Sequence, residues 1–387
     1  MRKTILWIFI FALFISFTAC VDGDKDFNEP NVKRLKSEYK MYNFPAYNMV
    51  LGMSKDASTF VALMDETKED GQKKLVFIDS ETALEKGRLT IDPRWQMMQK
   101  RARWSEDGSC FVLSDAWNSS VESRSANQVP GYVIYPEKMV MSSFGELPLE
   151  EEGNVACSPA FDSTGENVTF SVYNSETDHT THYIRNGQGP EDDMIFQTQT
   201  KGIASILMLS EGKYLESVES PTDGTDTILF INGEVKQTVA HVKDAFRSIY
   251  IKDYSENRRR VLIFETSLVT EGTQIAMEKI IPKIAEFDSD FEDFELKEIR
   301  LPKKYDVLNG ILSPGGRYIF FIVYSGQDFV LVLYDIQTSK TVELINNKEL
   351  GSTFIGTLPG RVDGLFVSDD LKILLTADNG VFLFRLE

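Results

Sequence analysis

Histidine and cysteine are scarce in this chain of 387 residues, which contains three of each. His179 and His182 stand three residues apart in an expected strand, where that spacing directs them to opposite faces and gives poor geometry for chelating a metal. We expect both to be solvated, and the third, His241, stands alone in the sequence. The sequence therefore predicts no metal site, and nothing in it indicates a cofactor.

Several motifs of known chemistry are also missing. The chain has no Gly-x-Ser-x-Gly nucleophile elbow, no Gly-x-x-x-x-Gly-Lys phosphate loop and no dinucleotide-binding fingerprint. Basic residues are few, with 41 Lys and Arg against 59 Asp and Glu, for a net charge of -18. An acidic surface repels phosphate backbones, so we expect no nucleic-acid partner.

Long apolar runs are absent after the first 20 residues. Arg2 and Lys3 precede an apolar run over residues 5–17, the pattern of a secretory signal. The run ends in Phe17-Thr18-Ala19-Cys20, which resembles a bacterial lipobox with Phe17 in place of the usual Leu. The resemblance implies a signal peptide over residues 1–19, cleavage before Cys20 and lipidation of its thiol. A plain signal peptide or membrane anchor with an incidental cysteine is the alternative.

Residues 20–31 are expected to form an acidic, flexible tether to the membrane. Acidic residues after the lipid cysteine also resemble a surface-export signal of some Gram-negative lipoproteins. The predicted location is therefore the outer membrane, facing either the periplasm or the exterior. Alternating acids at Asp22, Asp24 and Asp26 match the start of a calcium loop, but Phe27 and Lys33 stand where Gly and Glu are needed.

Two cysteines remain after Cys20, namely Cys110 and Cys157. The envelope is oxidising, so a disulfide between these two cysteines is one alternative. Both fall in expected strands, where small buried thiols are common, and we favour two buried thiols.

Residues 311–344 have the clearest pattern in the chain. Two apolar runs, 318–324 and 329–334, are separated by polar turns and followed by a strand-like tail, 341–344. Weaker copies of this meander recur, and the turns that open them are roughly 45 to 60 residues apart, near Ser54, Asp107, Ser163, Glu211, Ser255, Gly315 and Asp369. Strand repeats of this period predict an all-β fold, a β-propeller of four-stranded antiparallel blades.

We expect residues 32–387 to form a single propeller domain of seven blades, with six or eight as alternatives. The last repeat stops after three strands. A spare strand-like segment at residues 32–42 would supply the fourth and close the ring by pairing the two ends of the chain.

Three phrases resemble the Ser-Pro-Asp-Gly-Lys blade motif of TolB-like and WD40-like propellers: SPGGRYIFFIV, WSEDGSCFVL and VSDDLKILLTADNGVFLF. Residues 186–191 (NGQGPE) further resemble a Gly-x-Gly-Pro-acidic loop of TolB-like propeller lipoproteins of Gram-negative bacteria, although that loop usually lies earlier in the chain. Members of this family are mostly of unknown function, so the resemblance implies architecture and no catalytic residues.

A ligand or partner face is expected among irregular loops. Tryptophans at expected strand ends could stack on a sugar or peptide, or pack between blades, and the Gly-rich acidic loop could be a face loop or only a tight turn. The candidates are Trp95, Trp117, Gly187, Gly189, Pro190, Glu191 and Asp192.

Three other features are expected to be structural. Trp104 should pack in the core of its blade. The basic run 258–260 should be a solvated turn balanced by nearby acids. The acidic run 288–295 should be a solvated hairpin whose phenylalanines anchor it to the core.

These features favour a membrane-anchored module that binds a protein or glycan, or serves as a scaffold. The alternative is a propeller-type glycoside hydrolase or lyase with carboxylates in the central funnel. Two or three acids with a histidine or tryptophan at the channel mouth would favour the enzyme, whereas an apolar or scattered lining would exclude it.

Overall fold

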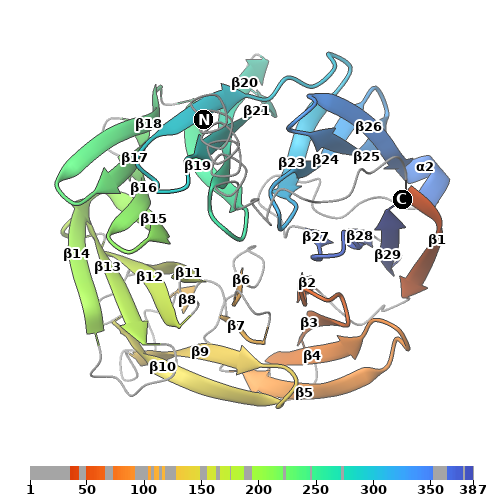
Figure 1. Ribbon diagram of the computed structural model, residues 1–387, viewed down its shortest axis with the longest axis horizontal. Coiled ribbons are helices and arrows are strands. Elements are labelled where there is room, and N and C mark those ends of the chain that lie inside the picture. Colours follow the sequence, from red (N-terminus) through yellow and green to blue (C-terminus); the bar gives the residue numbers. More distant parts are fainter. Residues whose placement is uncertain are drawn as a thin grey trace, which may run out of the picture.

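The computed structural model describes residues 35–42, 49–65, 73–91, 103–105, 109–112, 116–117, 128–148, 155–162, 166–174, 176–186, 194–220, 224–244, 246–271, 274–351, 364–377 and 380–386. Within these ranges the chain is almost entirely β-strand, as predicted. Figure 1 shows the strands gathered into antiparallel sheets that stand in a ring around a common centre. Nowhere in this part of the chain is there a helix with the length and apolarity to cross a membrane.

The first half of the chain forms three antiparallel sheets, and all their strands but β8 join in chain order. One sheet contains β2 (Met49–Met53), β3 (Thr59–Asp65), β4 (Lys73–Asp79) and β5 (Glu85–Ile91). The next contains β6 (Arg103–Trp104), β7 (Phe111–Val112), β9 (Gln128–Tyr135) and β10 (Val140–Pro148). The third contains β8 (Ala116–Trp117), β11 (Val155–Phe161), β12 (Asn167–Asn174), β13 (His179–Asn186) and β14 (Met194–Lys201).

The second half continues the pattern. A sheet of β15 (Ile203–Ser210), β16 (Lys213–Ser220), β17 (Thr225–Asn232) and β18 (Val235–Lys243) is followed by two linked sets of four. The first set is β19 (Arg247–Tyr254), β20 (Arg260–Glu271), β21 (Gln274–Phe287) and β22 (Phe294–Glu298). The second is β23 (Asp306–Leu312), β24 (Tyr318–Ser325), β25 (Asp328–Asp335) and β26 (Lys340–Asn346), followed by the short helix α2 (Asn347–Leu350). A single residue pair, Ile280 with Val307, links the two sets.

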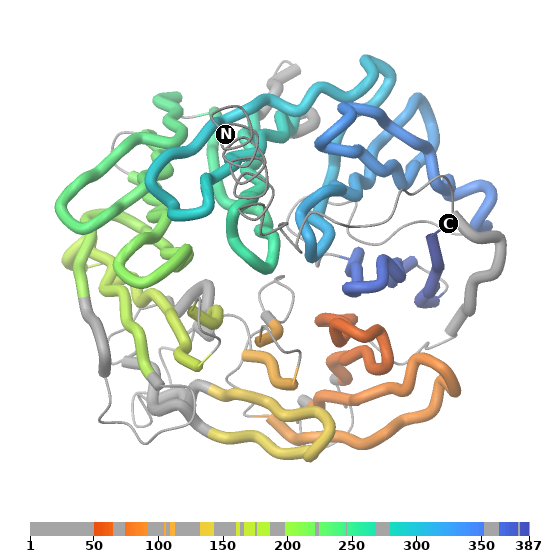
Figure 2. The backbone as a smooth tube through the Cα atoms, in the orientation of Figure 1, coloured from red at the N-terminus to blue at the C-terminus, as the bar shows by residue number. Residues whose placement is uncertain are grey.

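The final sheet joins the two ends of the described chain. It contains β27 (Leu365–Val367), β28 (Ile373–Ala377), β29 (Gly380–Leu386) and β1 (Leu35–Tyr42). β1 runs antiparallel to β29, with Met41 opposite Phe382 and Tyr42 opposite Val381. The tube in Figure 2 shows the neighbouring sheet of β2 and β3, in red, beside β27, in dark blue.

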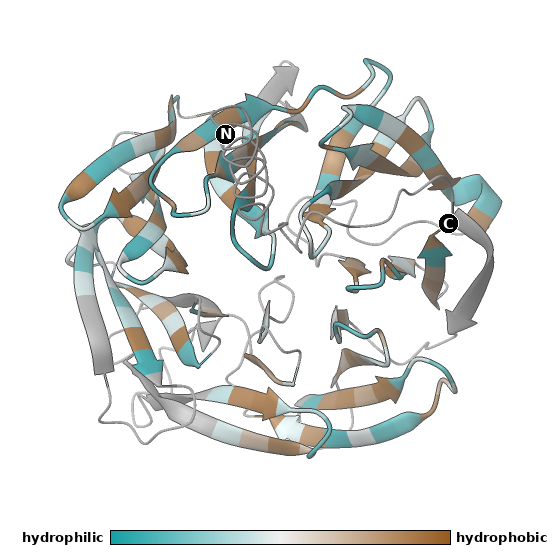
Figure 3. Ribbon diagram, viewed as in Figure 1, coloured by the Kyte–Doolittle hydropathy of each residue, from teal (hydrophilic) through white to brown (hydrophobic). Residues whose placement is uncertain are grey.

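The solid apolarity of β24 is explained by burial on both faces. Tyr318, Phe320 and Ile322 belong to one core cluster, shared with β28 and β29. Ile319 and Phe321, which alternate with them, belong to a second cluster shared with β20 and β21. Figure 3 shows hydrophobic residues concentrated along such strands and hydrophilic ones on the turns. Because successive side chains point to opposite faces, a strand between two cores must be apolar throughout.

In six of the repeats, the turn after the first strand is built around one buried hydroxyl or carboxylate. In the turn after β23, the Ser313 hydroxyl accepts a hydrogen bond from the Tyr318 backbone N–H at 3.0 Å. Equivalent bonds are made by Ser54, Ser105, Asp162, Ser255 and Ser368. This side chain supplies the acceptor that the backbone lacks at the turn, so the recurring serine is the residue that defines the repeat.

One further prediction is confirmed, and a second is confirmed in part. Phe287 and Phe291 are buried in a core cluster and Phe294 packs against it, while the acids between them are exposed. Cys110 is a buried thiol; the side chain of Cys157 lies outside the described part of the chain.

Candidate functional site

Five turns of the ring meet around a cavity of about 140 Å³. The turns are those after β2, β6, β19, β23 and β27, and the end of β11 also contributes. Its lining is Gly52, Met53, Lys55, Trp104, Ser105, Phe161, Tyr254, Glu256, Arg258, Leu312, Pro314, Phe366, Val367 and Asp369. Because these turns belong to the innermost strands of the ring (Figure 1), the cavity lies at one end of its central axis.

Polar contacts tie the turns together across this axis. Lys55 Nζ lies 2.7 Å from Glu256 Oε1, joining the turns after β2 and β19. The Asp369 backbone N–H donates to the Lys55 carbonyl at 2.9 Å, and the Glu256 N–H donates to the Pro314 carbonyl at 3.0 Å. The four turns after β2, β19, β23 and β27 are thus held in one arrangement. We call four charged residues of these turns the axial cluster: Lys55, Glu256, Arg258 and Asp369.

Of the two acids of the axial cluster, Asp369 has the raised pKa. Burial, together with the neighbouring Glu256 carboxylate, raises the pKa of Asp369 to about 6, against the opposing charge of Lys55. Glu256 and Asp369 also share a side-chain hydrogen bond. Below pH ~6 the cavity wall therefore carries a protonated Asp369 carboxyl beside Glu256.

Arg258 is buried, contrary to the prediction that residues 258–260 form a solvated turn. Its side chain is 8% exposed, and Nη2 donates to the Phe161 carbonyl at 2.9 Å and the Asp162 carbonyl at 2.5 Å. Its φ of 58° is left-handed, at the turn position where the next repeat has Gly316. A non-glycine residue in this region is strained, and the strain places the guanidinium beside the cavity. Its Nε has no hydrogen-bond partner.

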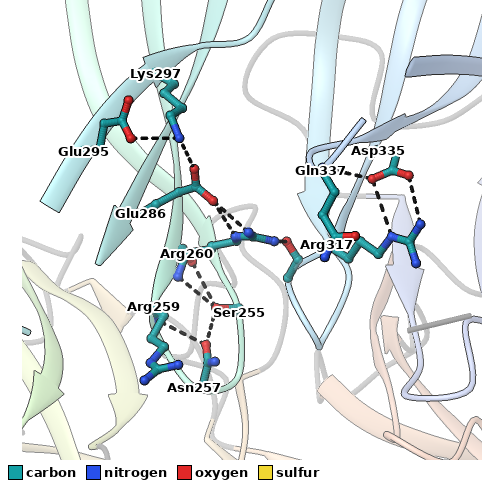
Figure 4. Close-up of polar contacts among 11 residues, drawn as sticks. Ser255, Asn257, Arg259, Arg260, Glu286, Glu295, Lys297, Arg317, Asp335 and Gln337 are labelled. Atoms are coloured by element: carbon teal, nitrogen blue, oxygen red, sulfur yellow. Dashed lines mark hydrogen bonds and ion pairs between the residues drawn. The ribbon is translucent and has the colours of Figure 1, made fainter. Parts of the chain in front are cut away.

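Arg260 is also engaged, by Glu286 of a neighbouring strand and by the Gly316 carbonyl of the next repeat, and is not in a solvated turn as predicted. Figure 4 shows its guanidinium between Glu286 and the next repeat, with Glu286 Oε1 at 2.8 Å. Glu286 in turn accepts from Lys297 at 2.7 Å. Local sequence could not reveal these partners, because they come from strands further along the chain.

A wider groove of about 640 Å³ adjoins the cavity. Lys55, Trp104 and Asp369 line both spaces. The rest of the groove lining is mostly hydroxyls and acids: Ser54, Asp56, Ser58, Thr59, Ser109, Pro136, Glu137 and Asp370. Trp104 packs against Phe111 at a centroid distance of 5.0 Å, as predicted for a core residue. Its buried Nε1, however, has no hydrogen-bond partner.

The raised pKa of Asp369 predicts a titration near pH 6. Between pH 3.8, the ordinary pKa of an aspartate, and about 6, the Asp369 carboxyl is protonated in the folded chain but ionised in the unfolded chain. The contribution of Asp369 to stability is therefore present below pH ~4 and lost as the pH rises through 6. Carbon-detected NMR of the carboxyl should give a midpoint near 6, and Glu256→Gln should lower it by removing the like charge.

Asp370 is the matched control for this titration. Burial opposes its ionisation, but hydrogen bonds from Lys372 and Ser368 outweigh burial and hold its pKa below the usual value. Asp370 should therefore already be ionised at pH 5. A midpoint for Asp369 at or below its ordinary pKa of 3.8 would contradict the effect of burial and of the neighbouring Glu256.

Most of the loop residues predicted from the sequence are not tested by the structure. Cys20, Trp95 and residues 187–193 lie outside the described ranges. Trp117 is carried by β8, where its backbone pairs with Val155. Sequence reasoning missed Lys55, Glu256 and Asp369. The signal was present, because each stands one position after the recurring turn serine.

His182 is fully buried, so the prediction that it is solvated is wrong. Its ring lies 2.8 Å from Ser171 Oγ through Nδ1 and 3.3 Å from Glu216 Oε1 through Nε2. His179 is exposed, which fits the predicted opposite faces. The buried set links β12 and β13 to β16 of the next sheet, and no solvent reaches it. Within the described ranges no three His, Cys, Asp or Glu side chains are grouped to hold a metal ion.

Comparisons with known proteins show the fold. No family model matches the chain, and no curated protein matches it. An oligogalacturonate lyase in complex with manganese superposes with a TM-score of 0.59 at 10% identity, covering 93% of this chain and 98% of that one. The β-propeller domain of the Trilobed protease from Pyrococcus furiosus gives 0.54 at 11% identity, covering 85% and 93%.

An acylaminoacyl peptidase gives a TM-score of 0.55 at 13% identity, covering 85% of this chain but only 50% of the peptidase. At such identities the likeness is one of fold alone. These neighbours support the predicted propeller fold, and the structure of the chain is similar to propellers of enzymes with different activities.

Proposed function

We propose that this chain is a seven-bladed propeller, closed by pairing of its two ends, that binds a glycan at the axial end of the ring. The groove beside the axial cluster supports the proposal. Its volume of about 640 Å³ falls within the range of small-molecule sites. The groove lining combines Trp104 with hydroxyls and carboxylates that can hydrogen-bond to sugar hydroxyls, and such a combination suits carbohydrate.

Seven blades follow from dividing the linked set of eight strands at its single residue pair, Ile280 with Val307. Each resulting group then has four principal strands, and β1 completes the last. A ring closed in this way has no open edge and holds the axial turns at fixed spacing.

The proposal is tested by calorimetry of the mature chain against a panel of oligosaccharides and of basic and neutral peptides. Saturable binding to oligosaccharides is expected. Glu137→Gln, in the exposed groove wall, should weaken it several-fold by removing a charged acceptor. The matched control is Asp290→Asn, an exposed acid of the β21–β22 turn. Binding to peptides alone would contradict a glycan site.

A second candidate is a glycoside hydrolase or lyase, favoured by one observation. Two acids, Glu256 and Asp369, line the cavity together with Trp104 at the end of the axis, and burial together with the neighbouring Glu256 raises the pKa of Asp369. This is the lining that the sequence analysis associates with an enzyme. The same oligosaccharides should then be cleaved, and Glu256→Gln should abolish cleavage while binding persists. If the oligosaccharides bind but no cleavage product forms, the enzyme candidate is wrong and glycan binding remains the proposed function.

We further propose that Cys20 carries a lipid and anchors the propeller to the outer membrane. The Phe17-Thr18-Ala19-Cys20 sequence and the apolar run before it support this. Labelled palmitate should enter the wild-type chain and be absent from Cys20→Ala, with Cys110→Ala as the control. Equal labelling of both variants would contradict lipidation at Cys20.

A further inference from the structure

Contacts across the central axis close the end of the ring at which the cavity lies. Figure 1 shows β2 and β19 on opposite sides of the ring. Lys55, in the turn after β2, nevertheless pairs with Glu256, in the turn after β19, with 2.7 Å between Nζ and Oε1. The side chain of Lys55 is only 18% exposed. This ion pair therefore spans the axis and obstructs the channel that the ring would otherwise enclose.

A second contact crosses the ring from the same turn. Arg258 Nη2 donates to the carbonyls of Phe161 and Asp162, at the end of β11, and the Arg258 side chain is buried. The Glu256 N–H also donates to the Pro314 carbonyl, in the turn after β23. One turn thus reaches three others, which come from different parts of the ring. The axial cluster is therefore a wall that is held from several directions.

The groove of about 640 Å³ borders this wall through Lys55 and Asp369, which line both the groove and the cavity. The other residues of the groove include the exposed Asp56, Ser58 and Glu137. A ligand in the groove can therefore extend outward over these exposed residues, but the ion pair blocks it at the axis. The cavity, of about 140 Å³, is far smaller than the groove and too small for a chain to continue through it.

We propose that the groove binds the end of a glycan chain, with the terminal sugar against the axial cluster. This inference rests on the proposed glycan-binding function and names the part of the glycan that is recognised. A terminal sugar carries a free hydroxyl where an internal sugar carries the link to its neighbour. The Lys55 ammonium can donate to that hydroxyl, and the Asp369 carboxyl can accept from it. An internal segment must leave the site in two directions, and the wall allows one.

The experiment counts the protein molecules bound per glycan chain. Calorimetry pairs every oligosaccharide of the panel with the unbranched polymer of the same linkage, beginning with maltohexaose and amylose and with xylohexaose and xylan. Recognition of the chain end gives a single protein molecule per chain, and equal affinity per chain, at both lengths. Several protein molecules on each polymer chain would overturn the inference and leave glycan binding standing. If no member of the panel binds, the proposed function and this inference both fail.

Lys55→Met removes the ammonium from the wall. It should lower the affinity several-fold, by the same factor for the oligosaccharide and its polymer, because both present the same chain end. Lys213→Met is the matched control and should bind as the wild-type chain does. Lys213 forms a similar ion pair with Glu292, and neither residue is in the described lining of the groove or the cavity.

An unchanged affinity of Lys55→Met would overturn the placement of the chain end at the axial cluster. If Lys55→Met does not fold, the number of protein molecules per chain, measured on the wild-type protein, decides the matter.

Discussion

Deleting residues 35–42 should lower the free energy of unfolding by roughly 4 kcal/mol or more. The segment is β1, whose backbone pairs with β29 from Leu35 opposite Leu386 to Tyr42 opposite Val381. Without it, the outer edge of β29 loses its hydrogen-bond partners, and the apolar residues Phe382 and Phe384, now 1% and 0% exposed, come close to solvent. The loss combines unpaired backbone groups with exposed core.

Chemical denaturation of the mature chain and the deletion variant gives the measurement. A lower midpoint and a greater tendency to aggregate are expected, because an exposed strand edge pairs with other chains. The matched control deletes residues 21–30, the acidic segment predicted to be a tether, and should melt as the intact chain does. If removing residues 35–42 also leaves the midpoint unchanged, closure of the ring by the two chain ends is wrong.

The strands could be predicted from sequence because their signal is local. In β24 an unbroken apolar run is bounded by a Ser-Pro-Gly-Gly turn, and the fold needs only neighbours on both faces to bury it. The serine that recurs in these turns can also be recognised from the sequence alone. Its hydroxyl accepts a hydrogen bond from a backbone N–H five residues further on in the same turn. Donor and acceptor are therefore close in sequence.

The axial cluster could not be predicted in the same way. Lys55 and Glu256 are 201 positions apart in the numbering, and their ion pair exists only once the ring brings the turns after β2 and β19 together. Arg258 seemed to be part of a solvated basic run because its neighbours in sequence are charged. Its partners are carbonyls of β11 and the residue after it, which nothing near position 258 can indicate.

An internal comparison of the turns would have identified Arg258 as unusual. Aligning the turns on their serines places it at the position of Gly316, where φ is 77°. A Cβ at Gly316 would approach the Ser255 side chain to 2.9 Å. Glycine is the expected residue for a left-handed turn position, so a long charged side chain there indicates a requirement beyond the turn itself.

Removing the Glu216 side chain should destabilise the protein by about 3–5 kcal/mol. Glu216 is 2% exposed and accepts from His182 and Thr200, while His182 also contacts Ser171. Burial opposes the ionisation of Glu216, but the hydrogen bonds from His182 and Thr200 outweigh it and hold its pKa below the usual value. Glu216→Ala would leave a buried imidazole and a hydroxyl without their acceptor, between two sheets that have little room for water.

The pH dependence of this set has a definite sign. The pKa of Glu216 in the folded chain is lower than the ordinary glutamate pKa of 4.5. Its ionised form therefore stabilises the fold above pH ~4.5. That stability is lost as the pH falls through the folded value. The wild-type chain should therefore lose stability in acid, and this part of the loss should be absent from Glu216→Ala.

His179 provides the matched control, since it lies on the same strand as His182 but is exposed on the opposite face. His179→Ala should change the free energy of unfolding by about 0.5 kcal/mol or less, while His182→Ala should cost nearly as much as Glu216→Ala. A double variant, His182→Phe with Glu216→Leu, should recover part of the loss, because apolar replacement of both partners removes the unpaired groups. Equal, small effects of His179→Ala and His182→Ala would show that the buried set contributes nothing to holding β13 against β16.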